Sequence, residues 1–286
     1  FARKTVVDKL KDAATEILEK DAKRLGIDAK VGDVVEIEVT PQDFGRIAAQ
    51  TAKQVIMQRI KEAERDLVYA EFIEREGEII TGIISKREGN NIIVDLGRAE
   101  GLLPSNEQIS NENYRPGGRM KFYIVEVKKT SKGSRIVLSR THPGLVRRLV
   151  ELEIPEVHDG LVDIRAIARE PGVRSKVVVE SRSEKIDPVG SCIGNRGTRV
   201  KNITDELRGE KIDIIRWSSD TRVLIAEALS PAHVAKVELD EATNTARVFV
   251  PQDQLSLAIG KDGQNARLAA RVTGWRIDIK GEKDGE

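Results

Sequence analysis

The sequence predicts a multidomain α+β protein, and three observations support this fold class. A mixed N-terminal segment leads into one long amphipathic helix, from about Phe44 to Phe72. Five short strands follow within residues 75–140, and a helix–turn–helix–strand stretch occurs twice in the remainder of the chain. At 286 residues, of which 33% are charged and 3% aromatic, the chain is long enough for several small domains with aliphatic cores.

Composition argues against several classes of protein. No apolar run approaches the roughly 18 residues of a membrane span, so we expect no membrane contact. The single cysteine, Cys192, precludes an internal disulfide bond and fits the reducing environment of the cytoplasm; its apolar surroundings predict a buried, inert thiol. With three scattered histidines besides, we expect neither a metal site nor a cofactor. The chain starts at Phe1 without a basic or apolar leader, so we predict neither a signal peptide nor a complete N-terminus.

The distribution of charge favours a polyanionic partner for the middle of the chain. The net charge of the whole chain is only +1. Residues 75–140, however, contain 12 basic and 8 acidic side chains, whereas residues 1–74 contain 13 basic and 15 acidic ones. A polyanion would therefore be attracted to the middle segment.

Residues 1–74 predict a partial α/β domain with a long helix. In order we expect a strand at Thr5–Val7, a helix at Ala13–Leu25 closed by Gly26, and a half-buried strand at Val34–Val39 broken by Pro41.

Small and aliphatic residues recur at three- and four-residue steps along the long helix, from Ala48 to Leu67, and form one apolar stripe. The helix would reach roughly 40 Å. We interpret it as a core helix that continues as a spacer and not as a coiled coil, because the stripe is alanine-rich and unbroken heptads are few.

Residues 75–140 predict a small closed barrel. Turns rich in glycine and asparagine separate five short strands, which is the pattern of such barrels. The expected strands are Glu78–Ile84, Ile92–Leu96, Gly101–Pro104, Met120–Val127 and Arg135–Ser139.

This segment resembles the S1-type oligonucleotide-binding (OB) fold at Gly82, Val94–Gly97, Glu100–Pro104 and Leu138–Arg140. The resemblance implies a five-stranded OB-type barrel with single-stranded RNA lying across it. Each basic side chain taken singly is better explained as a solvated surface cation. The candidates for phosphate contact are Lys86, Arg87, Arg98, Arg119, Lys128, Lys129 and Lys132.

Aromatic side chains for base stacking are scarce in this segment. The S1 family offers exposed aromatics near its second and third strands, where this chain has Asn91, Ile92 and Ile93. Phe122 and Tyr123 alternate, so we expect one of them to be exposed and include Phe122 among the RNA-binding candidates. Stacking contributes about 1–3 kcal/mol per base, so its scarcity would make binding more electrostatic.

The repeated stretch is the most specific feature of the sequence. It contains Gly194–Gly197 in its first copy and Gly260–Gly263 in its second, each between two helices and followed by an isoleucine-rich strand. A single Gly-x-x-Gly is better explained as a tight turn, but two copies with a cation in each favour a function. A nucleotide-binding P-loop is excluded, because Lys261 is followed by Asp262 and no upstream glycine is present.

Each copy ends a unit of the order helix–strand–strand–helix–turn–helix–strand, which resembles the prokaryotic (type II) KH domain. The first unit is expected at Leu145–Leu152, Val162–Ala168, Lys176–Val179, the first turn and Lys211–Ile215. The second is expected at Val223–Leu229, Val234–Leu239, Ala246–Val250, the second turn and Arg276–Ile279.

The chemistry of the repeated turn suits a nucleic-acid backbone. Glycines without Cβ atoms allow close approach, and the following helix begins with unpaired N–H groups that attract phosphate. Bases would lie against Ile193 or Ile259, and we expect the first copy to hold backbone and the second to contribute more base contact. Asp262 should weaken the second site unless its carboxylate points away. The RNA-binding candidates are Gly194, Asn195, Arg196, Gly197, Arg199 and Lys201 in the first copy, and Gly260, Lys261, Asp262, Gly263, Gln264, Asn265 and Arg267 in the second.

A basic turn from Arg169 to Lys176 precedes the first copy. Two interpretations stay open: an ordinary hairpin turn, or a clamp in which Arg169 and Lys176 bind RNA.

The order of the segments resembles the NusA family of bacterial transcription factors, above all in the runs Val39–Val55, Ala166–Gly172 and Gln254–Ala270. The resemblance implies an incomplete RNA polymerase-binding domain at 1–74, an S1-type domain at 75–141 and KH domains at 142–221 and 222–286. It further implies a monomeric, non-catalytic factor that binds RNA polymerase, nascent single-stranded RNA and other Nus factors, and that modulates pausing, intrinsic termination and antitermination.

Two other classes of function stay open. An RNA-processing phosphorolytic exonuclease carries the same modules, but it places KH before S1 and needs a large catalytic domain. The sequence also shows no metal-spaced carboxylate pair and no Ser/His/Asp set. The alternative is a protein-interaction scaffold whose KH folds have lost RNA; salt-dependent RNA binding would distinguish it from a transcription factor.

Overall fold

The computed structural model describes residues 1–38, 42–130 and 133–282, with side chains from residue 48 onward in the second range. These residues form two compact units, 1–64 and 65–286, which are described separately. No helix of the described residues is both long and apolar enough to cross a membrane.

The first unit contains a three-stranded sheet with the order β2-β1-β3, in which β1 pairs in parallel with β2 and antiparallel with β3. Its small core is formed by Val6, Ala22, Ala29 and Val35. The elements are β1 (Ala2–Val7), β2 (Glu16–Leu18), α1 (Glu19–Arg24), β3 (Val34–Ile37) and α2 (Gln42–Ile73), whose last residues belong to the second unit.

The helix predicted at Ala13–Leu25 is confirmed only in its C-terminal half, Glu19–Arg24. Glu16–Leu18 instead forms β2, because pairing with Thr5–Val7 prevails over local helix propensity, and only six residues remain helical. Gly26 follows the helix with φ 78°, as expected for a terminating glycine. Val39 and Pro41 lie outside the described residues.

The long helix is confirmed as α2, but its apolar stripe is not packed in the described residues. Ile56 and Ile60 are 58% and 47% exposed. Core packing begins only at the C-terminal end, where Phe72 is buried in the barrel core. The interpretation as a core helix therefore fails for the middle of the stripe.

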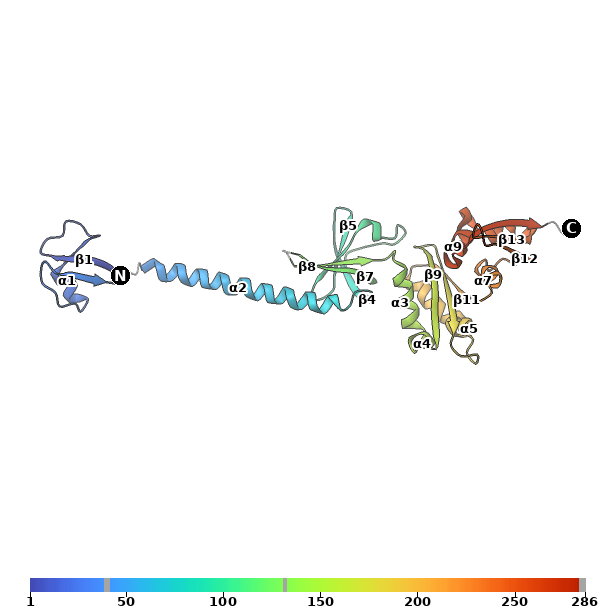
Figure 1. The fold of residues 1–286 in the computed structure, drawn as a ribbon, viewed down its shortest axis with the longest axis horizontal. Helices are drawn as coiled ribbons and strands as arrows, with labels where there is room; N and C mark the ends of the chain where they lie inside the picture. The colour runs from blue at the N-terminus through green and yellow to red at the C-terminus, as the bar shows by residue number, and fades with distance from the viewer. Residues whose placement is uncertain (39–41, 131–132, 283–286) are drawn as a thin grey trace. The chain divides into compact units, whose positions relative to one another are not determined.

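The five predicted strands form a closed barrel with the order β4-β5-β6-β8-β7. Figure 1 labels four of them, β4, β5, β7 and β8. Gly82 and Gly101 are required by packing, since a Cβ would lie 2.3 Å from the Val94 side chain and 2.5 Å from that of Leu138. The strands are β4 (Ile79–Glu88), β5 (Asn91–Asp95), β6 (Glu100–Leu103), β7 (Arg119–Thr130) and β8 (Gly133–Ser139), with a short 3-10 helix, η1, at Ser105–Glu107.

Two KH units of the same topology follow, so the expected fold class is confirmed. Each has a three-stranded sheet in which the first two strands are antiparallel and the last pairs in parallel with the middle one. The first KH unit comprises α3 (Pro143–Glu153), α4 (Pro155–His158), β9 (Val162–Glu170), β10 (Arg174–Ser181), α5 (Pro188–Ile193), η2 (Asn195–Gly197), α6 (Thr198–Glu206) and β11 (Lys211–Arg216). The second comprises α7 (Thr221–Ala228), β12 (Lys236–Asp240), β13 (Thr245–Pro251), η3 (Gln252–Gln254), α8 (Leu255–Ile259), η4 (Lys261–Gly263), α9 (Gln264–Thr273) and β14 (Arg276–Glu282).

A shared apolar core joins the two KH units. Ala168, Val178 and Ile215 of the first sheet belong to the same buried cluster as Ala228 and Leu268, which lie on α7 and α9 of the second unit. The two units therefore share one core without an intervening flexible linker.

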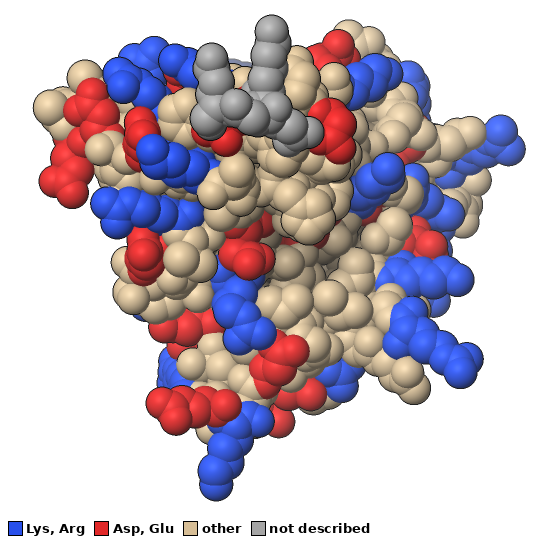
Figure 2. Space-filling model, turned by 90° about the vertical axis from the view of Figure 1, so that its right-hand side faces the viewer, with Lys and Arg blue, Asp and Glu red and all other residues tan. Residues whose placement is uncertain are grey.

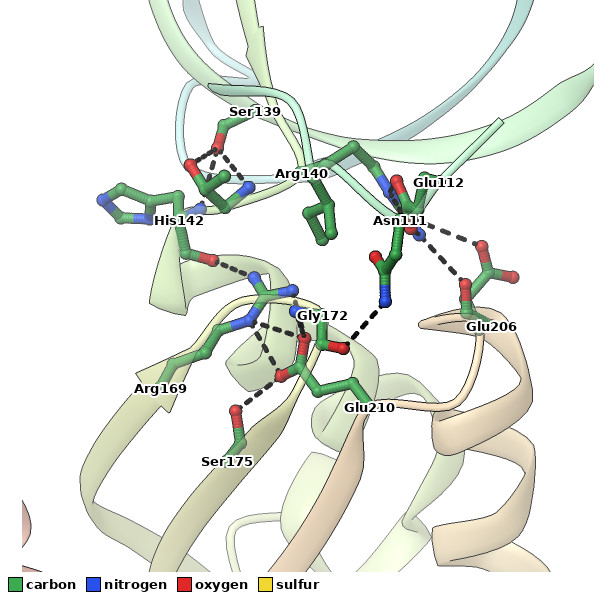
Figure 3. A network of polar contacts seen from close by, with 12 residues as sticks. Asn111, Glu112, Ser139, Arg140, His142, Arg169, Gly172, Ser175, Glu206 and Glu210 are labelled. Atoms are coloured by element: carbon green, nitrogen blue, oxygen red, sulfur yellow. Dashed lines mark hydrogen bonds and ion pairs between the residues drawn. The ribbon is translucent and has the colours of Figure 1, made fainter. Parts of the chain in front are cut away.

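A buried ionic network joins the barrel to the first KH unit (Figure 3). Arg140, at the end of the barrel segment, is fully buried and donates to the equally buried carboxylate of Glu112 and to the Lys121 carbonyl at 2.7 Å. It also donates to the carbonyl of Glu206 on α6 at 3.0 Å. Burial raises the pKa of Tyr114, whose hydroxyl donates to Glu112 at 2.7 Å.

Arg140→Met is expected to lower the free energy of unfolding by about 3–5 kcal/mol, because it leaves the Glu112 carboxylate buried without its cation. Urea denaturation followed by circular dichroism measures the loss. Arg87→Met, which removes an exposed guanidinium from the same barrel, is the matched control and should change stability by no more than about 0.5 kcal/mol. Similar small losses in both variants would contradict a structural role for the buried pair.

Candidate nucleic-acid interface

The two Gly-x-x-Gly turns have the same backbone conformation. We call Gly194–Gly197 the first loop and Gly260–Gly263 the second loop. The first glycines have φ/ψ of 72°/179° and 75°/171°, and the last have 74°/17° and 71°/15°. In each loop the last glycine donates its N–H to the carbonyl of the first at 3.2 Å. The duplication seen in the sequence is therefore a duplication of local geometry.

The first glycine of each loop is required for a packing reason as well. A Cβ on Gly194 would lie 2.8 Å from Cγ of Arg199, and one on Gly260 would lie 2.9 Å from the backbone nitrogen of Asn265. The last glycines face open space: nothing lies within 4 Å of a Cβ on Gly197, and only the Arg267 guanidinium comes within 3.8 Å of one on Gly263. Each loop therefore presents an unobstructed backbone at its outer end.

Three of the candidate cations beside the loops are free to bind an anion. Arg196 and Lys201 in the first copy and Lys261 in the second are exposed. Their side chains form no hydrogen bond or ion pair with other described residues. The helices α6 and α9 begin directly after the loops, so their first N–H groups add to the attraction for phosphate.

The other two cations are already engaged. Arg199 donates to Glu156 on α4 at 2.7 Å and to the Ser191 carbonyl. Arg267 donates to Glu170 on β9 at 2.6 Å and to the Asp262 carbonyl at 3.0 Å. Sequence reasoning missed both acids, because they lie 43 and 97 residues away from their partners and no local spacing connects them.

Asp262 occupies the same backbone position as Arg196. Both have φ 53°, with ψ 28° and 27°, and both side chains are exposed. The second loop therefore offers one free cation, Lys261, and one carboxylate, Asp262. The first copy offers two free cations, Arg196 on the loop and Lys201 on the helix that follows it. The first copy is therefore the more electropositive of the two, and its role in holding the RNA backbone stays a prediction.

An exposed apolar side chain precedes each loop. Ile193 and Ile259, the last residues of α5 and α8, are 39% and 37% exposed, and Leu257 nearby is also exposed. Cys192 is fully buried, and burial together with the neighbouring Glu156 raises the pKa of its thiol to about 12. The predicted buried thiol is confirmed.

The face in Figure 2 carries basic side chains close beside acidic ones. Among the described residues, no cluster of three His, Cys, Asp or Glu side chains could hold a metal ion.

Family models match the chain along its length. Residues 1–66 match the NusA N-terminal domain, 74–140 the S1 RNA binding domain, 140–217 the NusA-like first KH domain and 221–286 the NusA-like second KH domain. The transcription termination/antitermination protein NusA of Halalkalibacterium halodurans is 56% identical over the whole chain, which spans 75% of that protein. The chain belongs to the NusA family. The NusA proteins of Bacillus subtilis and Thermus thermophilus are 56% and 44% identical over 99% and 96% of the chain, which spans 76% and 71% of their lengths.

Several of the residues assigned to RNA from the sequence are structural in this NusA-family chain. Arg169 is buried and donates to Glu210 at 2.9 Å and to the His142 carbonyl at 2.8 Å. Lys176 is fully buried and donates to Asp213 and to the Ser230 carbonyl, each at 3.1 Å. Their assignment as an RNA clamp is wrong, because both charges are used inside the fold.

The remaining two corrections concern a polar and an aromatic side chain. Asn265, one of the RNA-binding candidates of the second copy, is buried and donates to the carbonyls of Leu229 and Ala258, so its side chain is not available to RNA. Phe122 is fully buried in the barrel core, so it cannot stack on bases. Tyr123 stacks on His142 with ring centroids 4.5 Å apart and packs into the junction with the first KH unit. The expectation of one exposed aromatic at this pair fails.

The barrel cations divide into paired and free groups. Lys86, Arg98, Lys128 and Lys129 are exposed but pair with Glu88, Glu71, Glu126 and Asp66, respectively. Arg87 and Arg119 are exposed and form no ion pair with other described residues. Lys132 lies outside the described residues. The barrel surface thus retains Arg87 and Arg119 as its free candidates.

Gly260→Ala is expected to lower the free energy of unfolding by about 3 kcal/mol, and Gly263→Ala by about 1–2 kcal/mol. The first glycine lies in a backbone region that is nearly closed to residues with a Cβ, whereas the last lies in the left-handed helical region. Chemical denaturation of the two variants provides the comparison, with each serving as the other's control. Equal losses would show that the second loop does not adopt this conformation.

Proposed function

We propose that this chain is a non-catalytic transcription factor that binds RNA polymerase and holds nascent single-stranded RNA on its S1 and KH units. In this role it would modulate pausing, intrinsic termination and antitermination together with other Nus factors in the cytoplasm. The observation that carries the proposal is the pair of loops with one backbone geometry, placed after a closed barrel in a NusA-family chain. The relatives are named as transcription termination/antitermination proteins, not as enzymes.

The proposal divides the chain into four parts. Residues 1–74 contact polymerase, 75–141 form the S1-type barrel, and 142–221 and 222–286 form the two KH domains. The last three parts belong to one compact unit. A buried ionic junction connects the barrel to the first KH unit, and an apolar core connects the two KH units. These contacts support one continuous RNA surface in place of separate sites.

At the first loop, the sugar–phosphate backbone approaches Gly194 and Gly197, which offer no Cβ. Phosphates are attracted by the start of α6 and by the free side chains of Arg196 and Lys201. A base placed beside the loop would cover Ile193, removing exposed apolar surface from water. A loop of this kind clamps about four nucleotides.

At the second loop, Lys261 supplies the free cation, while the exposed carboxylate of Asp262 repels phosphate. The backbone geometry is the same, so base contact against Ile259 has a larger share of the binding energy here. Gln264 and Arg267 border this loop, but both hydrogen-bond to Glu170.

The barrel contributes mainly charge. Arg87 and Arg119 are exposed and unpaired among the described residues, whereas the aromatic side chains Tyr114 and Phe122 are buried and Tyr123 stacks on His142. Binding there is therefore expected to weaken steeply as salt is raised.

Arg196→Asp and Lys261→Asp should each weaken binding of single-stranded RNA by at least about fivefold at roughly 0.1 M salt, because each removes one phosphate contact. Each should also reduce the slope of log affinity against log salt by about 0.7. Fluorescence anisotropy at several salt concentrations measures both quantities.

Lys30→Asp is the matched control, since it reverses an exposed charge in the first unit and should leave RNA affinity within about twofold. The phosphate role of the loops is wrong if the loop variants bind RNA as tightly as this control. If the parent chain shows no salt-dependent RNA binding, the chain is better described as a protein-interaction scaffold.

Removal of residues 1–64, the first compact unit, should abolish retention of purified bacterial RNA polymerase while leaving RNA affinity within about threefold, because Phe72 of the barrel core and the free loop cations all lie in the second unit. A pull-down with the immobilised chain and with its shortened form tests this assignment. Equal retention of polymerase by both forms would contradict it.

A further inference from the structure

The turn between β9 and β10 contacts three domains at once. It runs from Glu170 to Val173 in the first KH unit. On one side, the Asn111 side chain of the barrel segment donates to the Gly172 carbonyl at 3.0 Å (Figure 3). Within its own unit, the Gly172 N–H donates to Glu210 at 2.8 Å. On the other side, Glu170 accepts from the second KH unit.

The contact with the barrel is close and leaves no room for a side chain. Gly172 has φ 74°, and a Cβ there would lie 2.4 Å from the Ile109 side chain and 2.7 Å from the Asn111 amide oxygen. The turn is therefore held against the barrel segment by both shape and hydrogen bonding.

The contact with the second KH unit reaches the residues that follow the second loop. Glu170 accepts from Nε2 of Gln264 at 2.7 Å and from Nε of Arg267 at 2.6 Å. Its side chain is only 19% exposed, and the hydrogen bond from Arg267 is the main reason that the pKa of its carboxyl group lies below the ordinary value. Arg267 in turn donates to the Asp262 carbonyl inside the loop, so the acid is connected to the loop backbone.

The apolar core between the KH units does not by itself define one orientation. Apolar burial is non-directional, and the residues that meet there include small alanines, namely Ala168 and Ala228. Directional contacts must select one arrangement. Among the described residues, polar side-chain contacts between the units include the bonds of Glu170 and, elsewhere on the sheet, the bond from Lys176 to the Ser230 carbonyl.

We propose that Glu170 is a positioning residue for RNA: it fixes the second loop relative to the first so that one strand engages both. This inference rests on the proposed function. When two linked sites are held in the right relative placement, binding at one raises the local concentration of ligand at the other. Glu170 supplies that placement without itself contacting RNA.

The test compares a short and a long RNA on the full chain. The probes are adenine-rich, unstructured RNAs of about 4 nucleotides, which one loop can clamp, and about 20 nucleotides, which has the length to reach both. Glu170→Ala should reduce affinity for the long RNA by about tenfold and change affinity for the short RNA by less than about twofold. Glu170→Gln keeps an oxygen that can accept one of the two bonds, so its effect should lie between Ala and the parent.

Glu241→Ala is the matched control, because it removes an exposed carboxylate from a turn of the second KH unit and should leave both affinities unchanged. Thermal unfolding of each variant identifies any loss of fold. Equal loss of affinity for short and long RNA would overturn the inference, as would unchanged affinity for the long RNA. If the parent binds neither RNA, the proposed function itself fails.

A second measurement needs no RNA. Spin labels at Asn195→Cys and Lys261→Cys report the distance between the loops, and the buried Cys192 is protected from labelling. Glu170→Ala should broaden the distance distribution, and Glu241→Ala should not. A narrow distribution in Glu170→Ala would show that the loops are placed by other contacts, and the positioning role would be wrong.

Discussion

The buried ion pair between Arg140 and Glu112 is the constraint on which the rest of the second unit depends. A guanidinium that is fully removed from water is tolerated only with a paired carboxylate and further acceptors, which here come from the barrel and from α6. Because its acceptors belong to both domains, satisfying this one charge requires the barrel and the first KH unit to be docked. The ion pair of Arg169 with Glu210 extends the same junction toward the turn at Gly172.

Internal carboxylates also decide which basic residues remain available for RNA. Glu156 and Glu170 each engage one arginine beside a loop, and Asp213 engages the buried Lys176. Burial lowers the pKa of Lys176, and the nearby Asp213 opposes that effect. Beside the loops, the free cations of the described residues are Arg196, Lys201 and Lys261, so the proposed RNA binding relies on where these side chains are placed. The identical backbone of the two loops supplies that placement locally, and the contacts between the domains extend it over the unit.

Sequence periodicity predicted most of the fold, because the strands of the barrel and the elements of both KH units follow local patterns of apolar residues. The helix predicted at Ala13–Leu25 was partly wrong, because Glu16–Leu18 pairs with β1 instead. Local helix propensity carries no information about such pairing between strands. The loop glycines were predictable, since a backbone with positive φ that packs closely against neighbouring atoms leaves few alternatives to glycine. Local sequence could not predict the structural roles of four residues, because each depends on a partner or a core formed by residues distant in sequence. These are Arg169, Lys176, Asn265 and Phe122.

We propose that the two KH loops form one RNA surface on a single compact unit. Amide NMR of the full chain during titration with a long single-stranded RNA tests it most directly, since Gly197 and Gly263 each report on one loop. Both signals are expected to shift together, with one dissociation constant and one stoichiometry. Signals that shift at clearly different RNA concentrations, or a shift at only one loop, would contradict a shared surface.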